Sequence, residues 1–421
     1  MLHRIFGALP NRWVIAAASC LMQAALGSVY AASVFRAAVM DHYGASERGA
    51  SLAFTITIFA LGITAGFGGA LQRRLGPRLT GTLGGLLYGA GVCLAAIAPN
   101  LSLFYLTQGL MAGIGLGLGY IVPLAMLIGW FPDKRGLITG LAVAGFGAGA
   151  AIIGPVAAAM LTQVGLSTTL MILGAGYLAV GVGAAQLFRA APEGYAPPGW
   201  TSPARSRSAT ATRDFTLTEA LKTPRWYLLW LVLALNVTAG AALISVASPL
   251  TREFTGVPVE TAALAVMTIA LCNGAGRIFW GWTSDRIGRP LTFISLFLVQ
   301  SFAFCLLARI GDFAQLLLLS GIIGLCFGGG FAVMPAFAAD FFGAKNAGAI
   351  YGAMLTAWSA GCAAGPLLIA SIDYRAAAAV IAGAMLAGVP LTLSLFVTRR
   401  FGFSLPMAAL FGGDPVAAGD D

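Results

Sequence analysis

Arg277 is the one charged side chain between Glu260 and Asp285, in a stretch that otherwise reads as an apolar helix. It precedes Asp285 by eight residues, which is about 12 Å along a helix. In a hydrocarbon core about 30 Å thick, such a charge lies near the midplane and costs about 3 kcal/mol or more. A charge there faces a water-filled path or a partner, and every Asp and Glu lies in a loop, a tail or a span end, with Asp340 nearest to a span. Because guanidinium binds carboxylate in a two-pronged geometry, Arg277 predicts a carboxylate site.

Two alternatives to this interpretation remain open. In the first alternative, Arg277 binds no anion and instead extends its guanidinium to the membrane surface or bonds it to helix carbonyl groups. Asn273 lies four residues earlier and therefore on the same helix face, where its amide is suited to bond the anion or a substrate hydroxyl. In the second alternative Asn273 is only a helix-packing amide.

The composition requires a membrane to position these residues. The chain has 421 residues, of which 59% are hydrophobic and 9% charged, against about 25% charged in soluble domains. Long apolar segments predict an all-α membrane protein with twelve transmembrane helices in contact with lipid. The predicted spans are 13–35, 50–71, 79–98, 103–129, 137–160, 167–188, 225–249, 260–283, 291–308, 313–339, 347–370 and 376–397. We interpret the first as an uncleaved helix and not as a signal peptide.

Catalytic and metal chemistry have little support in this composition. The two histidines, His3 and His42, lie outside the spans, and the six cysteines form no C-x-x-C pair. Without a buried histidine or acid, the spans hold neither an activated nucleophile nor a metal ligand set. We therefore predict no enzyme activity, no cofactor and no metal.

The basic residues indicate the orientation of the chain. With the N-terminus inside, the inner loops and tails hold 18 Lys and Arg, whereas the outer loops hold five. The outer five are Arg36, Arg48, Arg252, Arg309 and Arg375. The positive-inside rule then places both termini in the cytoplasm of a multi-pass protein of the cell (inner) membrane. This asymmetry explains the net charge of +9 without a nucleic-acid partner.

An internal repeat divides the chain into halves. A shift of 211 residues aligns the loop 130–136 (WFPDKRG) with 341–348 (FFGAKNAG). A shift of 212 pairs QRRLGPR (72–78) with SDRIGRP (284–290). We predict a duplicated six-helix unit with the substrate between the halves. The predicted divisions are an N-terminal bundle, 1–189, a cytoplasmic linker with a short helix near Leu217–Leu221, 190–222, a C-terminal bundle, 223–400, and a cytoplasmic tail, 401–421.

These motifs carry a resemblance to a known family. GWTSDRIGR (281–289) resembles the loop motif of the major facilitator superfamily, although Arg73 stands where the first half usually has an Asp. The segments 11–13 (NRW), 130–136, 219–230, 273–289 and 342–352 look like the oxalate/formate antiporters and related bacterial monocarboxylate transporters. The resemblance implies the major facilitator fold, two pseudo-symmetric six-helix bundles, and a chain that is usually monomeric.

The resemblance also implies roles for individual residues. The arginine matching Arg277 binds the carboxylate substrate in that family, and aromatic positions line the cavity. The matching aromatic residues are Tyr30, Tyr120, Phe146, Phe331 and Tyr351. Oxalate transporters carry a second buried cation where this chain has Met354, and a dicarboxylate with one cation would keep an uncompensated buried charge.

We therefore predict a secondary transporter of a small monocarboxylate such as lactate, pyruvate, formate or a related 2-hydroxy or 2-oxo acid. The alternatives are an oxalate/formate-type dicarboxylate exchanger and an exporter of another organic anion. A proton or a counter-anion remains open as the coupled partner. Rocking of the halves would be controlled at the cytoplasmic side by Asp285, Arg286, Lys134 and Lys345.

Overall fold

The computed structural model describes residues 11–197, 214–309 and 311–401, and in this part of the chain the regular structure is helical throughout. Ten helices there are long and apolar enough to cross a membrane. To within a few residues, each of the twelve predicted spans falls inside one of them.

The helices follow one another with short connections. In chain order they are α1 (Arg12–Gly27), η2 (Ser28–Ala31), α2 (Ala32–Tyr43), α3 (Glu47–Ala95), α4 (Leu101–Phe104), η3 (Tyr105–Met111), α5 (Ala112–Trp130), α6 (Arg135–Gln186), α7 (Leu217–Leu221), α8 (Pro224–Thr255), α9 (Val259–Ile287), α10 (Arg289–Leu307), α11 (Phe313–Phe342), α12 (Ala347–Met354), α13 (Thr356–Ser371) and α14 (Tyr374–Phe401). The element α7 lies where the sequence predicts a short helix. The predicted tail beyond 401 and residues 198–213 of the predicted linker lie outside the described residues.

Two glycines explain why twelve predicted spans correspond to ten helices. The helices α3 and α6 contain 49 and 52 residues, and each is interrupted once by a glycine with a positive φ. Gly76 has φ 80° and ψ 163°, and Gly165 has φ 74° and ψ 178°. This backbone region is essentially restricted to glycine. Each long helix is therefore two spans joined at a glycine turn.

The repeat is visible in the backbone. Gly288 joins α9 to α10 with φ 88° and ψ 156°, close to the values at Gly76, which lies 212 residues earlier. The two copies of the repeated loop thus make the same sharp turn. The glycine in both copies has a steric reason, because a side chain would clash in this conformation.

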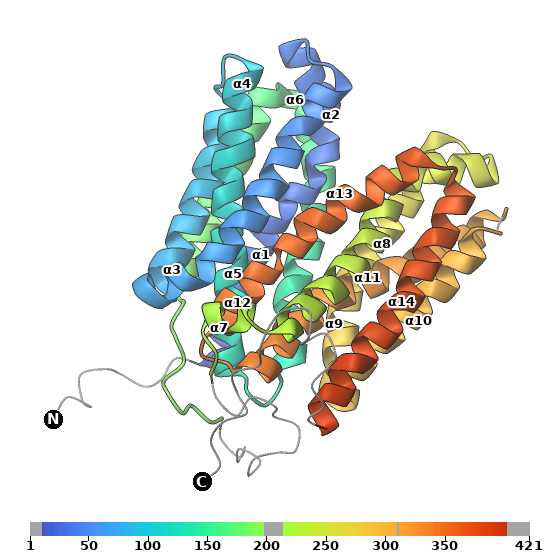
Figure 1. Cartoon of the computed structure of the whole chain (residues 1–421). Helices are drawn as coiled ribbons and strands as arrows, with labels where there is room; N and C mark the ends of the chain where they lie inside the picture. Colours follow the sequence, from blue (N-terminus) through green and yellow to red (C-terminus); the bar gives the residue numbers. More distant parts are fainter. Residues whose placement is uncertain (1–10, 198–213, 310, 402–421) are drawn as a thin grey trace, which may run out of the picture.

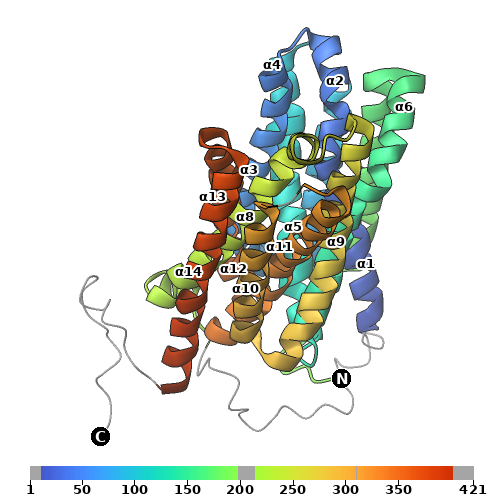
Figure 2. The same ribbon diagram turned by 90° about the vertical axis from the view of Figure 1, so that its right-hand side faces the viewer.

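The helices form two bundles (Figures 1 and 2). In the first, α3 packs on α5 and α6, and α1 packs on α6; in the second, α9 packs on α11, α8 on α13 and α10 on α14. The bundles meet at the end where α1 begins and α14 finishes, which we call the basic end, and diverge at the other, which we call the open end (Figure 1).

Small residues allow the bundles to touch backbone to backbone at the basic end. A Cβ added to Gly140 of α6 would lie 2.2 Å from the carbonyl oxygen of Arg277 in α9. On the other side of the interface, a Cβ on Gly69 of α3 would lie 2.4 Å from the amide nitrogen of Ala349 in α12. Two glycine-lined helix crossings thus close this end.

The helices run past the apolar spans. The first membrane helix continues through η2 and α2 to Tyr43. The charge count placed Arg36 in an outer loop, but Arg36 lies in α2. Helical continuation satisfies backbone groups internally wherever the membrane ends.

Candidate functional site

A cavity of about 890 Å³ lies between the two bundles. It extends from Asn273, Tyr30 and Trp358 at its floor to Arg36 and Ala50 towards the open end. Its lining is mostly apolar, and the described residues that line it include no Asp, Glu or His. The hollow therefore has the size and central position of a solute path but supplies no acid of its own.

Arg277 lies directly beneath this floor and is only 1% exposed. Its Nε donates to Oδ1 of Asn273 at 3.0 Å, and its Nη1 donates to the carbonyl oxygen of Val143 in α6 at 2.6 Å. In the described part of the chain Arg277 forms no ion pair. The guanidinium is thus oriented by neutral oxygens from both bundles, and its charge is not neutralised.

Aromatic rings surround Arg277 on the sides. The Tyr30 and Tyr120 rings each meet the Phe146 ring edge-on, with centroids 5.2 Å apart. The guanidinium carbon lies 5.8 Å from the Phe146 centroid and 5.6 Å from that of Phe331. These distances are typical of cation–π contacts, which stabilise a charge without neutralising it. The structure brings the predicted aromatics together around the arginine.

Three phenol groups in this cluster have unused hydrogen-bonding capacity. In the described part of the chain, the hydroxyl oxygens of Tyr30, Tyr120 and Tyr351 are buried and make no hydrogen bond of regular geometry. The Tyr30 hydroxyl lies beside Arg277, and the hydroxyls of Tyr120 and Tyr351 lie beside one another. All three lie within electrostatic reach of Arg277. A phenol can donate one hydrogen bond to an anion. Arg277 and the three hydroxyls therefore form a buried cluster, here named the Arg277 chamber, with one positive charge and several neutral donors.

The helix α12 contributes an apolar residue at the position where the sequence analysis looked for a second buried cation. Met354 is fully buried at the end of α12. Trp358, one turn further on, was not among the predicted site residues, yet its ring packs 4.8 Å from Phe331. Nothing in the sequence alone distinguishes Trp358 from a lipid-facing tryptophan, because its position follows from the rotation of the helix.

Asp285 joins the two bundles at the basic end. Its carboxylate accepts hydrogen bonds from the backbone N–H groups of Gly136 and Leu137 at 2.9 and 2.8 Å, at the start of α6. It also accepts from Nη1 of Arg289 at 2.6 Å. An acid at a helix N-terminus satisfies free N–H groups and complements the helix dipole. Here the helix and its cap belong to different bundles.

The contact between α3 and the start of α12 corresponds through the repeat to the contact between Asp285 and the start of α6, but it has no acid. Arg73, 212 residues before Asp285, donates to Oδ1 of Asn346, next to the start of α12. A second ionic contact forms around Asp340, which pairs with Arg135 at 3.4 Å and with Arg289 at 3.3 Å. Asp340, Arg135 and Arg289 were not among the predicted gate residues, because charges at span ends also fit an ordinary solvated surface.

The other predicted gate residues make no such contact. Lys134 and Lys345 are exposed, and neither side chain has a hydrogen bond or ion pair in the described part of the chain. Arg286 is exposed and stacks over the Trp282 ring at 3.5 Å. Long charged side chains at a surface gain little from pairing and remain hydrated.

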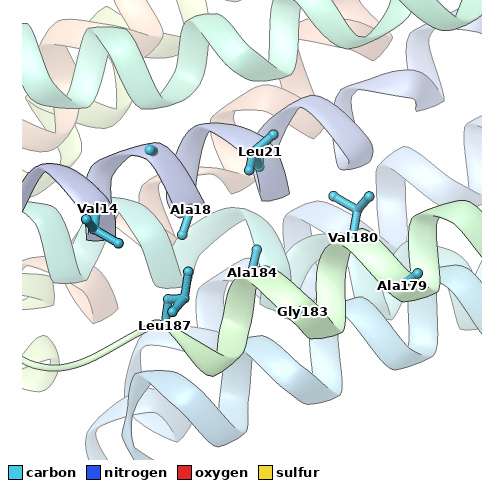
Figure 3. A pocket seen from close by; sticks show the side chains of 9 residues that line it. Val14, Ala18, Leu21, Ala179, Val180, Gly183, Ala184 and Leu187 are labelled. Atoms are coloured by element: carbon cyan, nitrogen blue, oxygen red, sulfur yellow. The ribbon is translucent and has the colours of Figure 1, made fainter.

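A second hollow, of about 400 Å³, lies between α1 and the end of α6 (Figure 3). Its lining consists of apolar and glycine residues such as Leu21, Val180 and Leu187. It offers no side-chain donor for an anion. This groove is suited to apolar chains and is separate from the Arg277 chamber.

Comparisons with known proteins agree with this architecture. The family model of the Major Facilitator Superfamily matches residues 13–270 and 229–406. The chain is similar in structure to the fucose:proton symporter FucP of E. coli, with a TM-score of 0.69, 16% identity, and coverage of 90% of this chain and 98% of that one.

Three relatives in sequence are informative. An uncharacterized MFS-type transporter, YhjX, of Escherichia coli (strain K12) is 30% identical over 81% of this chain and 84% of its own. The oxalate:formate antiporter of Oxalobacter formigenes is 28% identical over 94% of both chains. The apicoplast pyruvate carrier 1 of Toxoplasma gondii is 28% identical over 69% of this chain and 64% of its own. The chain therefore belongs to the major facilitator superfamily and is a multi-pass membrane transporter, not an enzyme.

Proposed function

We propose that this transporter carries a small monocarboxylate, such as lactate, pyruvate, formate or a related 2-hydroxy or 2-oxo acid. The observation that carries the proposal is the buried guanidinium of Arg277, which has no acidic partner among the described residues and lies below a cavity between the bundles. A carboxylate would supply the missing negative charge. Asn273 and the hydroxyls of Tyr30 and Tyr120 would bond the same anion.

The charge balance of the chamber favours one carboxylate over two. With Met354 buried where a second cation would lie, Arg277 neutralises a single negative charge. A second carboxylate in this apolar chamber would remain unpaired, which is costly. Tyr351, Phe331 and Phe146 would complete the walls around the non-carboxylate part of the substrate.

Alternating access is the proposed mechanism, with the cavity at the open end facing the cell exterior. The excess of basic residues at the other end supports a cytoplasmic location of both termini in the inner membrane. Asp285 would hold the cytoplasmic side closed through its cap on α6 and release it when the bundles rock. We propose that a monomer carries out this cycle, with the six-helix units 1–189 and 223–400 as its moving parts.

Coupling follows from the same charge balance. The described lining of the cavity holds no Asp, Glu or His that would carry a proton. Return of the empty carrier leaves the Arg277 charge without an anion in the midplane. This supports exchange of one anion for another, with a proton entering only together with the substrate.

The proposal is tested by Arg277→Gln in the full chain, purified and reconstituted into vesicles. We expect counterflow of labelled pyruvate or lactate to fall to the level of empty vesicles. Arg225→Gln, at an exposed arginine at the start of α8, is the matched control and should retain flux. Undiminished flux in Arg277→Gln would refute the proposal, and preferential uptake of oxalate by the unmutated chain would favour a dicarboxylate exchanger instead.

A further inference from the structure

Trp358 lies at the centre of the aromatic cluster. Its ring centroid is 4.8 Å from Phe331, 5.7 Å from Tyr120, 6.0 Å from Phe146 and 6.3 Å from Tyr30. It is 1% exposed, and it belongs to the second bundle while three of its four ring partners belong to the first. Among the described residues, no other ring in this cluster contacts four other rings.

The position of Trp358 separates two spaces. Trp358 lines the floor of the cavity between the bundles, whereas Arg277, Tyr120 and Phe331 lie below that floor and do not line it. An anion that reaches Arg277 from the open end therefore crosses the floor formed by Tyr30, Asn273 and the indole of Trp358. Once bound, the part of the substrate that points away from Arg277 must fit beside it.

Two interruptions of regular helix meet at this point. Tyr30 lies in η2, the short 3₁₀ segment between α1 and α2. Leu355 separates α12 from α13. The backbone N–H of Trp358 donates to the carbonyl oxygen of Leu355 at 2.9 Å, three residues earlier, which is a tighter turn than that of an α-helix. Mid-helix 3₁₀ turns often mark hinges. One such turn from each bundle thus carries one member of the Tyr30–Trp358 pair.

We propose that Trp358 is a specificity-determining residue, whose indole roofs the Arg277 chamber and limits the length of the substrate side chain. The inference rests on the proposed function, because it needs a carboxylate anchored at Arg277. On this inference a short 2-oxo or 2-hydroxy acid binds between Arg277 and the ring. Each added methylene has to displace a ring that is packed against four others, and overpacking of such a site is costly.

The test uses the purified full chain and a series of unbranched 2-oxo acids, from pyruvate to 2-oxooctanoate, with dissociation constants measured by calorimetry. The unmutated chain should bind pyruvate more tightly than the eight-carbon acid. In Trp358→Ala the dissociation constant of 2-oxooctanoate divided by that of pyruvate should fall at least tenfold. Trp358→Phe keeps a ring and should shift the ratio at least threefold, which preserves the test if the alanine variant fails to fold.

Trp226→Ala is the matched control. Trp226 is also a buried tryptophan of the second bundle, but it lies at the start of α8, outside the cavity lining, where its Nε1 donates to the carbonyl oxygen of Ile350 at 3.5 Å. Its ratio should match that of the unmutated chain. Unchanged ratios in both folded Trp358 variants would overturn this inference alone. Failure of the unmutated chain to bind any acid of the series would overturn the proposed function and the inference with it.

Discussion

The substitution Asp285→Asn tests whether the basic end is closed by a helix cap that spans the two bundles. The carboxylate accepts from the N–H groups of Gly136 and Leu137 at 2.9 and 2.8 Å, and it complements the positive end of the α6 dipole. The amide keeps one acceptor oxygen and loses the charge. Hydrogen bonds to a charged group contribute about 1.5–3 kcal/mol each, so the loss is about 2–3 kcal/mol. The ratio of the open-end conformation to its alternative should then fall about 30- to 150-fold.

Labelling of a cysteine in the cavity measures this ratio. Ser245 is exposed on the cavity wall, so Ser245→Cys reacts with a membrane-impermeant maleimide only when the cavity is open. The reaction is read at position 245 by peptide mass spectrometry, because the chain also has six native cysteines. We expect the labelling rate to fall in Asp285→Asn, with the decrease depending on how far the starting equilibrium favours the open conformation.

Asp373→Asn is a matched control. Asp373 also accepts two N–H bonds at a helix start, from Arg375 at 2.9 Å and Ala376 at 3.0 Å, but this cap lies within one bundle. Its loss should lower stability without changing the labelling rate at position 245. Equal rates in the two aspartate variants, or a rate in Asp285→Asn no lower than in the unmutated chain, would refute the idea that the cap favours one conformation.

Three further outcomes are expected. Met354→Lys should add a second cation to the chamber and give measurable oxalate binding by calorimetry, and no gain of dicarboxylate binding in a folded protein would contradict the charge argument. Gly140→Ala places a Cβ 2.2 Å from the Arg277 carbonyl oxygen and should reduce labelling at position 245, whereas Gly183→Ala, where a Cβ meets nothing within 4 Å, should not. Gly76→Ala should lower the free energy of unfolding by about 1–3 kcal/mol, because φ is 80° there, and thermal unfolding in detergent should show no such loss for Gly183→Ala.

Much of the architecture was predictable from the sequence because it depends on properties that each segment has by itself. A long apolar stretch must be helical in lipid, whatever surrounds it. The echo between Gly76 and Gly288 predicted a repeated loop, and both glycines make the same turn because no other residue tolerates that backbone. Arg277 was identifiable as a candidate site because its charge stands alone in an apolar span.

The contacts of the site depend on how the helices rotate and cross, and these were accessible only from the tertiary structure. The partner of Arg277, the Val143 carbonyl, is 134 residues away, and the cap of α6 by Asp285 joins residues 149 apart. Lys134 was predicted as a gate residue together with Asp285, but it is exposed and its side chain has no hydrogen bond or ion pair in the described part of the chain. Likewise Trp358 is one apolar ring among many until the packing of α13 places it above the arginine. The sequence by itself determined which segments enter the membrane and which charge enters with them. Helix packing decided which side chains face that charge, because rotation of a helix by a fraction of a turn exchanges a cavity-facing residue for a lipid-facing one.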